Sequence, residues 1–540
     1  MVCANDAGES TGRAGSPEQP SGSGSIAAAA GITFLGNLAS RVLGLVRQST
    51  IAHAFGAQGA LSAFIAVSAV PKMIYEMLIG GMLSAALVPV LSEYASEEDR
   101  AQLWRLASTL LGMAMVIMAG TVLILEILAP AIPPLLVSGF DADLRQTATT
   151  LTRVIVPVLL MFGASGIVTA LLYSLKRFTY PAMGAAIYNA GMIISVLLLA
   201  PRIGVSALSV GVLLGGFLQL AVQIPGLRGM KLSPSLDWSH PALRRILRLY
   251  APVALSLIIS NLGIFIDRSL ASRTAEQAIT WMDDATSLFQ YPLGLISMAI
   301  SVAILPTLSR IDARVKREEF RGTVSLGLRL VLVLVIPAAI GLLVLGVPVI
   351  ALIYEHGSFT TYDTAQTSRA LRYYLVGLPF AAIDLPLVFA FYAQKDTVTP
   401  VIVGIAGVAI YLLVGPALAF TLGMGFVGLV IANAVQLTSH ALIMLILFRR
   451  RFGGIQGRRI LSSAIKAVVA SIIMGTCSHF AFRAVATRLD ASRTLHEIIL
   501  VAIPGLIGIA TYLISATLLG VEEISLIRKT IGERLGGPRR

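Results

Sequence analysis

The sequence predicts an all-α polytopic membrane protein with about fourteen transmembrane helices. Its mean hydropathy is +0.84, and only 13% of its 540 residues are charged, whereas soluble domains carry about 25% charged residues. Many apolar runs reach about 18 residues or more, the length of a helix that crosses a bilayer. These runs do not alternate between apolar and polar residues, which excludes the spans of an outer-membrane β-barrel.

Fourteen segments have this apolar character, with ends that hydropathy fixes only to within several residues. We place them at about 26–48, 60–91, 107–131, 150–174, 181–200, 204–224, 246–266, 280–306, 326–352, 370–393, 399–421, 424–447, 461–485 and 496–519. Residues 1–25 are rich in Gly, Ser, Pro and Glu and are predicted to form a disordered tail. They lack the basic stretch and cleavage site of a signal peptide, so the first apolar segment is retained as a span.

The Lys and Arg content of the connections between spans predicts the orientation of the protein in the membrane. The connections at 227–247, 310–321 and 449–459 and the C-terminal segment 521–540 carry four or five Lys and Arg residues each. The connections on the opposite side mostly carry one or two. Because basic residues are retained in the cytoplasm, both termini are predicted to be cytoplasmic, with 521–540 a basic tail. These residues also account for the net charge of +13, so nucleic acid is not an expected partner.

The two halves of the chain resemble each other at separations of 217 to 219 residues. Leu-Val-Pro-Val-Leu-Ser at 87–92 returns as Ile-Leu-Pro-Thr-Leu-Ser at 304–309, and 173–181 returns at 392–400 with Tyr, Lys and Pro in place. Gly-Phe at 139–140 returns as Gly-Ser-Phe at 357–359. We therefore predict two parallel six-helix lobes, 26–225 and 226–450, related by an axis along the membrane normal, with two extra helices at 451–520. Such lobes enclose a central cavity and favour a transporter with alternating access over a channel.

Two arginines lie within the first span, where each costs about 2.5–3.5 kcal/mol at a helix centre. Arg41 lies past mid-depth, and Asn37 is one turn earlier on the same face. Arg41 either contacts an anionic substrate or pairs with an acid of another span. Arg47 points about 120° away from Arg41 and lies near the outer boundary, so it either faces a cavity or snorkels to the surface.

Three further charges deep inside predicted spans are candidate site residues. Lys72 and Glu76 are four residues apart on one helix face, directly after Pro71. They can pair with each other, or they can bind a substrate or, for Glu76, a coupling ion. Asp384 lies between two prolines with no cation nearby on its own helix. It either pairs with Arg41 or Lys72 across the lobes or binds a coupling cation, H⁺ or Na⁺.

The remaining polar residues are expected to have structural roles rather than roles in binding or catalysis. Asp267, Asp283 and Asp284 fall at span ends, where solvated or helix-terminal positions near the outer surface are expected. Four amides within spans are expected to hydrogen-bond between helices: Asn261, Gln290, Asn433 and Gln436. The histidine spacing predicts no metal site and the two cysteines no disulfide. Without a Walker A sequence we expect no ATP hydrolysis, no cofactor and no enzymatic activity.

Several stretches occur in the order of a known family. They are Ser-Arg-Val-Leu-Gly-Leu-Val-Arg at 40–47, Ala-Phe-Gly-Ala at 54–57, Leu-Val-Pro-Val-Leu-Ser-Glu-Tyr at 87–94, Tyr-Pro-Leu-Gly at 291–294, Ile-Leu-Pro-Thr-Leu-Ser at 304–309, and Glu-His-Gly-Ser-Phe at 355–359. In this order they resemble the MurJ (MviN) family of lipid II flippases in the multidrug/oligosaccharidyl-lipid/polysaccharide (MOP) exporter superfamily.

The resemblance implies a multi-pass protein of the bacterial cytoplasmic (inner) membrane that serves peptidoglycan and cell-wall biogenesis, and hence cell shape. Its substrate would be lipid II, an undecaprenyl-pyrophosphate-linked muropeptide, moved from the inner to the outer leaflet. Arginine suits the pyrophosphate because its guanidinium matches phosphate oxygens bidentately. The last two helices of the family form a groove for the lipid tail.

This chain departs from the family pattern at several charged positions. The family usually has Asp where Ser62 stands, Arg near Tyr75 and Glu76, Glu where Gly80 stands, and Ala-Asp-Arg where residues 285–287 read Ala-Thr-Ser. Three alternatives therefore stay open. They are a flippase for another polyprenyl-linked saccharide, an ion-coupled antiporter of small organic cations, and a non-transporting scaffold for cell-wall synthesis enzymes.

We predict that Arg41→Ala abolishes rescue of a flippase-depleted strain while the protein still reaches the membrane. The physical reason is the loss of a guanidinium held at mid-depth for the anionic part of the substrate. The measurement is growth after depletion, with membrane quantity checked by immunoblot. Full rescue by the variant would remove Arg41 from the site.

Overall fold

The fold is a bundle of long helices with no strand among the residues that the structure describes. The computed structural model describes residues 22–80, 82, 86–96, 99–230, 237, 241–488 and 494–535, without some side chains of the first helix, of the helix at 241–272 and of the C-terminal helix. The first half contains α1 (Gly22–Phe55), α2 (Gly59–Tyr75), η1 (Glu76–Gly80), α3 (Val88–Glu93), α4 (Arg100–Leu128), α5 (Ile132–Leu136), α6 (Ala142–Ile155), α7 (Val158–Ser174), α8 (Thr179–Ile203), α9 (Ser206–Ala221) and η3 (Ile224–Leu227). Most of the predicted tail, residues 1–21, lies outside the described residues.

The second half has the same order of long helices. It contains α10 (Pro241–Ser272), α11 (Ala278–Pro292), η4 (Leu293–Ser297), α12 (Met298–Arg310), α13 (Arg317–Tyr354), α14 (Thr361–Ala393), α15 (Val398–Pro416), η5 (Ala417–Thr421) and α16 (Phe426–Phe452). Three helices follow it: α17 (Gly457–Ala486), α18 (Thr494–Leu518) and α19 (Glu522–Leu535).

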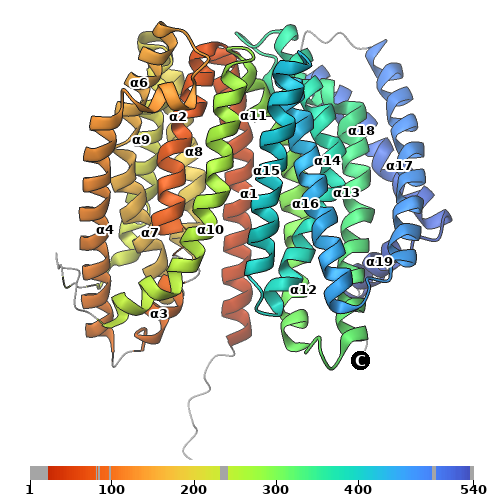
Figure 1. Cartoon of the computed structure of the whole chain (residues 1–540), viewed down its shortest axis with the longest axis horizontal. Coiled ribbons are helices and arrows are strands. Elements are labelled where there is room, and N and C mark those ends of the chain that lie inside the picture. Colours follow the sequence, from red (N-terminus) through yellow and green to blue (C-terminus); the bar gives the residue numbers. More distant parts are fainter. Residues whose placement is uncertain are drawn as a thin grey trace, which may run out of the picture.

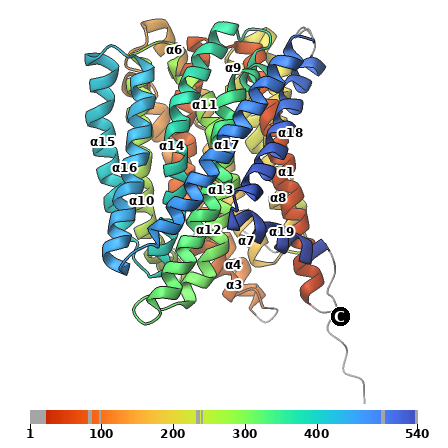
Figure 2. The ribbon, with the colours of Figure 1, turned by 90° about the vertical axis from the view of Figure 1, so that its right-hand side faces the viewer.

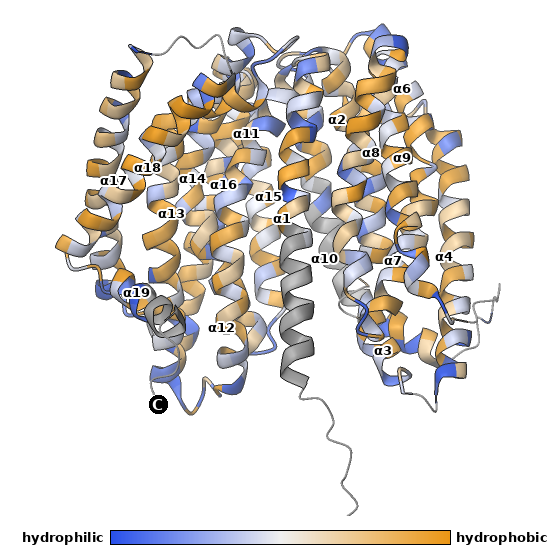
Figure 3. Ribbon diagram, turned by 180° about the vertical axis from the view of Figure 1, so that it is seen from behind, coloured by the Kyte–Doolittle hydropathy of each residue, from blue (hydrophilic) through white to orange (hydrophobic). Residues whose placement is uncertain are grey.

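The helices have the lengths and surfaces of membrane spans. In the described part of the chain, 12 helical segments are long and apolar enough to cross a bilayer. The other two predicted spans coincide with α1 and α10, helices of 34 and 32 residues. Large apolar side chains such as Ile127 and Leu413 are 78% and 76% exposed, as expected for a lipid-facing surface. Figure 3 shows hydrophobic residues along much of the length of the helices, with many hydrophilic residues toward the two ends.

The internal repeat of the sequence is also present in the helix boundaries of the two halves. The segment Ala142–Ser174, which holds α6 and α7, has 33 residues, and so has α14, Thr361–Ala393. A π-helical turn follows α2 as η1 and follows α11 as η4. Lys176 and Lys395 both adopt the left-handed conformation, with φ of 59° and 61°. The two halves therefore share these irregular turns as well as their helix order.

The two lobes share one apolar core at one end and have separate cores at the other. The shared core joins residues of both lobes, among them Leu61 and Phe64 of α2 and Trp281 and Met282 of α11. A second core lies within the first lobe around α3 and α4, and a third lies within the second lobe around Phe320 of α13. The α12–α13 connection lies at the end with separate cores, together with the start of α1 and with α19 (Figure 1). We call this end the basic end and the opposite one the outer end, after the orientation that the charge of the connections predicts.

The last three helices pack on the outside of the second lobe. Figure 2 shows α17 and α18 beside α13, with α19 at their basic end, and the contacts of α13 with α17, α18 and α19 agree. The segment predicted as a basic tail is thus helical as far as Leu535. Glu523 of α19 is fully buried and forms an ion pair with Arg329 of α13 at 2.7 Å. The hydroxyl of Ser463 on α17 donates to the same carboxylate at 3.0 Å.

We predict that Glu523→Ala lowers the thermal stability of the purified protein, because it leaves the Arg329 charge buried without its partner. Breaking such a pair costs about 3–5 kcal/mol. The measurement is the apparent melting temperature in detergent. The matched control is Glu522→Ala, since the Glu522 side chain is 79% exposed beside the same arginine and an exposed pair contributes only about 0–1 kcal/mol. Equal shifts for the two variants would contradict the prediction.

Candidate functional site

Two cavities lie between and within the lobes, and they meet. The first has a volume of about 600 Å³ and is lined mainly by α1, α2, α8, α10 and α11. The second has a volume of about 730 Å³ and is lined mainly by helices of the second lobe, α10, α11, α14, α15 and α16. Four residues line both: Lys72, Ile264, Arg268 and Asp283. Three of these four are charged, so the junction of the cavities is the polar centre of the protein.

Arg47 lines the first cavity and is held there by the first lobe. Its Nη1 donates to the Asn189 side-chain oxygen at 3.0 Å. The Asn189 amide nitrogen in turn donates to the carbonyl of Ser40 at 3.1 Å. Arg47 Nε is buried without a hydrogen-bond partner among the described residues. The guanidinium therefore has a fixed position and unused donor capacity, as a binding site for an anion requires.

Arg41 and Asn37 lie on the same helix as Arg47. Arg41 is exposed and lines neither of the two cavities. The side chain of Asn37 lies outside the described residues. Of the two arginines of α1, Arg47 is thus the one that lines the first cavity.

Lys72 and Glu76 line the first cavity without pairing with each other. Both side chains are exposed, and neither forms an ion pair with another described residue within 4.0 Å. The alternative in which they neutralise each other is therefore wrong for this structure. The backbone keeps α-helical register between them, since the Glu76 N–H donates to the Lys72 carbonyl. The two side chains nevertheless stay apart in the open cavity, because a solvated pair gains little free energy from contact.

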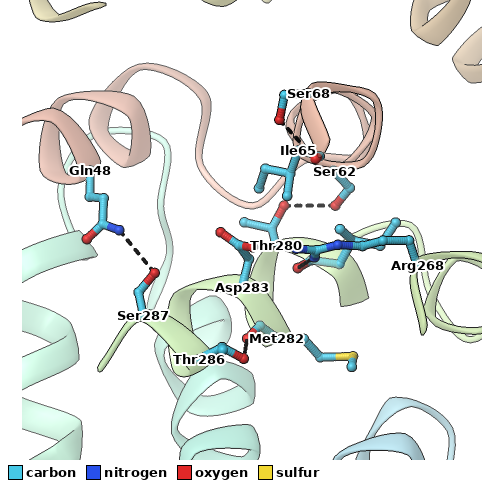
Figure 4. Close-up of polar contacts among 11 residues, drawn as sticks. Gln48, Ser62, Ile65, Ser68, Arg268, Thr280, Met282, Asp283, Thr286 and Ser287 are labelled. Atoms are coloured by element: carbon cyan, nitrogen blue, oxygen red, sulfur yellow. Dashed lines mark hydrogen bonds and ion pairs between the residues drawn. The ribbon is translucent and has the colours of Figure 1, made fainter. Parts of the chain in front are cut away.

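Arg268 and Asp283 form an ion pair at the junction of the cavities (Figure 4). The Arg268 Nη2 to Asp283 Oδ1 distance is 2.5 Å, and the two side chains are 15% and 38% exposed. The expectation that Asp283 is an outer-surface acid is wrong, because α11 begins at Ala278 and Asp283 lies in its second turn. Arg268 was missed because the predicted span ended at 266, whereas α10 continues to Ser272.

The other acids near the outer end also face the interior. Asp284 lines the first cavity. Asp267 lines the second cavity and accepts a hydrogen bond from the Tyr411 hydroxyl. The expected outer-surface positions of both are therefore wrong for the same reason, since the helices that carry them extend further than hydropathy indicates. Their sequence signal was the cluster of four charges, 267–268 and 283–284, on both sides of one short turn.

Asp384 lines the second cavity and pairs within its own lobe. The distance from Asp384 Oδ1 to His440 Nδ1 of α16 is 2.8 Å, and the two side chains are 19% and 18% exposed. The predicted partners, Arg41 and Lys72, are not its contacts. His440 escaped the sequence reasoning because no spacing rule connects residues of two helices so far apart in the chain.

The amides singled out in the sequence also lie at the cavities. Asn261 lines the first, and Gln290, Asn433 and Gln436 line the second. A further amide, Gln48, joins the lobes: it donates to the Ser287 hydroxyl at 3.1 Å and accepts from the Tyr354 hydroxyl at 3.3 Å. Figure 4 shows the Gln48–Ser287 contact beside Asp283. In the described part of the chain, no group of three or more His, Cys, Asp or Glu side chains is placed to hold a metal ion.

The walls of the cavities differ in charge. The first lobe contributes Arg47, Lys72 and Glu76. The second lobe contributes Arg268 against four carboxylates, which are those of Asp267, Asp283, Asp284 and Asp384. The site therefore runs from a cationic wall on the first lobe to an acidic wall on the second, with Lys72 and Arg268 between them.

Comparisons with known proteins give a consistent result. The family model described as "Lipid II flippase MurJ" matches residues 51–501. A probable lipid II flippase MurJ of Haemophilus influenzae is 31% identical over 75% of this chain and 83% of that relative. The lipid II flippase MurJ of Burkholderia cenocepacia is 28% identical over 77% of this chain and 82% of that relative.

Solved structures share the fold. A lipid II flippase MurJ in an inward closed conformation matches with a TM-score of 0.73 and 24% identity, covering 90% of this chain and 98% of that one. An inward-facing multidrug MATE transporter of the MOP superfamily matches with a TM-score of 0.67 and 14% identity, covering 77% and 94%. With a family model matched over most of its length and a relative 31% identical over most of both chains, this chain belongs to the lipid II flippase MurJ family.

Proposed function

We propose that this chain is a lipid II flippase that carries the lipid-linked peptidoglycan precursor from the inner to the outer leaflet of the bacterial cytoplasmic membrane. The observation that carries the proposal is the meeting of Arg47, Lys72 and Arg268, from both lobes, at joined cavities in a chain of this family. The activity is transport, so the protein makes and breaks no covalent bond of the substrate.

The charge pattern fits the chemistry of the substrate. Its pyrophosphate is an anion, and guanidinium groups bind phosphate oxygens through two parallel hydrogen bonds. Arg47 and Arg268 supply two guanidinium groups, and Lys72 supplies a third positive charge. Asp283 pairs with Arg268 while the site is empty. When the substrate binds, its pyrophosphate, the stronger anion, replaces part of this pairing. Arg41, on the exposed face of the same helix as Arg47, extends this cationic path.

The division of the apolar cores supports alternating access. One core joins the lobes at the outer end, and separate cores fill each lobe at the basic end. With the basic end in the cytoplasm, as the positive-inside rule predicts, this conformation faces inward. Lipid II then enters from the inner leaflet, with its tail along α17 and α18 and its head group in the cavities.

The acidic wall is the proposed place of a coupling cation. Asp384 and His440 form a pair whose charge changes when one proton is added, and a monovalent cation can bind the same carboxylate. Glu76 is a second candidate, because its carboxylate is exposed in the first cavity. The same acidic wall favours one alternative function, the antiport of small organic cations. No observation favours a non-transporting scaffold.

We predict that Arg268→Ala abolishes rescue of a strain depleted of its own lipid II flippase, and that Arg268→Lys rescues in part. Lysine keeps the positive charge but loses the bidentate geometry. The matched control is Arg202→Ala, which removes an exposed charge at the end of α8 away from both cavities. Growth is scored at equal membrane quantity, and rescue by Arg268→Ala equal to that of the control would contradict the site.

We predict that Asp384→Asn stops lipid II translocation driven by a proton gradient in proteoliposomes, because the neutral amide can neither release a proton nor bind a cation. Asp384→Glu should retain part of the rate. A sodium gradient applied without a pH difference distinguishes the two ions. If the wild-type chain fails to rescue despite full expression, and dye efflux responds to Asp384→Asn, the antiporter function replaces the flippase.

A further inference from the structure

Two residues that correspond to each other in the internal repeat hydrogen-bond to each other at the outer end. Ser62 Oγ of α2 lies 2.8 Å from Thr280 Oγ1 of α11, at a separation of 218 residues (Figure 4). Both side chains are 0% exposed. In a symmetric dimer, a residue on the two-fold axis contacts its own copy. By the same geometry, this hydrogen bond marks the pseudo-two-fold axis that relates the lobes.

A backbone contact lies on one side of this axis. The turn after α13 packs on the end of α1, where the Ser358 N–H donates to the His53 carbonyl at 3.0 Å. Gly56 and Gly357 have φ of +57° and +60°, and a Cβ on either would lie 2.3 Å from a carbonyl oxygen across this contact. The approach of the two backbones therefore requires glycine on both sides.

The corresponding contact lies on the other side of the axis. The turn before α6 packs on the end of α10, where the Gly139 N–H donates to Ser272 Oγ at 3.1 Å. A Cβ on Gly139 would lie 2.4 Å from the Ser272 carbonyl oxygen. Gly139 and Gly357 are separated by 218 residues, and so are Ala54 and Ser272. Each lobe thus places one turn against the end of the first helix of the other lobe.

We propose that these three contacts form one symmetric outer seam and that the seam sets how often the outer side opens. The seam consists of Ser62–Thr280 at its centre, with the turn at 357–358 against the end of α1 on one side and the turn at Gly139 against Ser272 at the end of α10 on the other. Because the repeat relates the two lateral contacts, outward opening breaks them together. Weakening either one therefore shifts the population toward the outward-open state. The consequence for transport rests on the proposed flippase function, whereas the opening itself does not.

The test measures opening directly. In a Cys3→Ser, Cys477→Ser background, Ser68→Cys places one thiol in the first cavity. A membrane-impermeant maleimide added outside intact cells reaches this thiol only when the seam opens. Gly56→Ala and Gly139→Ala should each raise the labelling rate at least about threefold, as expected when a minor state becomes more populated.

The matched control is Gly204→Ala. Gly204 has the same φ of +57° as Gly56, but nothing lies within 4 Å of its added Cβ. It therefore places a side chain at the same positive φ without a clash between lobes, and its labelling rate should equal that of the background. Unchanged labelling in both seam variants, or a response of one variant only, would overturn the symmetric seam.

A cross-link tests the centre of the seam even where a glycine variant fails to fold. In the same background with the Ser68→Cys reporter, the pair Ser62→Cys and Thr280→Cys should form a disulfide on oxidation, which stops outside labelling of the reporter. Reductant should restore the labelling. Persistent labelling of the cross-linked protein would overturn the proposal. If the labelling follows the predictions but the wild-type chain fails to rescue, the seam stands and the flippase function falls.

Discussion

The free-energy cost of placing a charge in a bilayer determines where this protein can place its charged site residues. A carboxylate or guanidinium facing lipid is expensive, so polar side chains gather where two lobes enclose space away from the lipid. Many large apolar side chains of the helices are exposed on the outside of the bundle, and the charged residues of α1, α2, α10, α11 and α14 meet in the cavities. The two-lobe arrangement is therefore the condition for the site, because no single lobe provides both the cationic and the acidic wall.

The fold was predictable because its signals are local or repeated. Hydropathy marks each span separately, and the recurrence at 173–181 and 392–400 marks the lobes. The structure keeps these features, down to the π-helical turns that follow α2 and α11. Arg268 was not predictable by the same means. The charge that a buried site requires lowers the hydropathy by which a span is recognised, so the predicted span ended just before it. Asp283 fell inside a predicted span, but its pairing with Arg268 depends on the packing of α10 against α11.

The remaining errors have two further physical causes. Pairing of Lys72 with Glu76 was inferred from α-helical spacing, which the structure keeps, but both side chains are exposed in the cavity, where a solvated pair gains little free energy. The partner of Asp384 was sought among strong cations, whereas His440 satisfies it from a neighbouring helix of the same lobe. Such a pair depends on the packing of α14 against α16. A single sequence carries no signal for it.

The repeat divides the molecule into positions that stay alike and positions that diverge. At a separation of 218 residues, Ser62 matches Thr280 and Gly139 matches Gly357. At the same separation, the charged Arg47 matches Phe265 and Lys72 matches Gln290. Opening and closing need two lobes that meet face to face, which similarity provides. Binding an anion on one wall and a cation on the other needs two unlike walls. The duplicated scaffold can serve both needs because its contacts and its charges occupy different positions along the same helices.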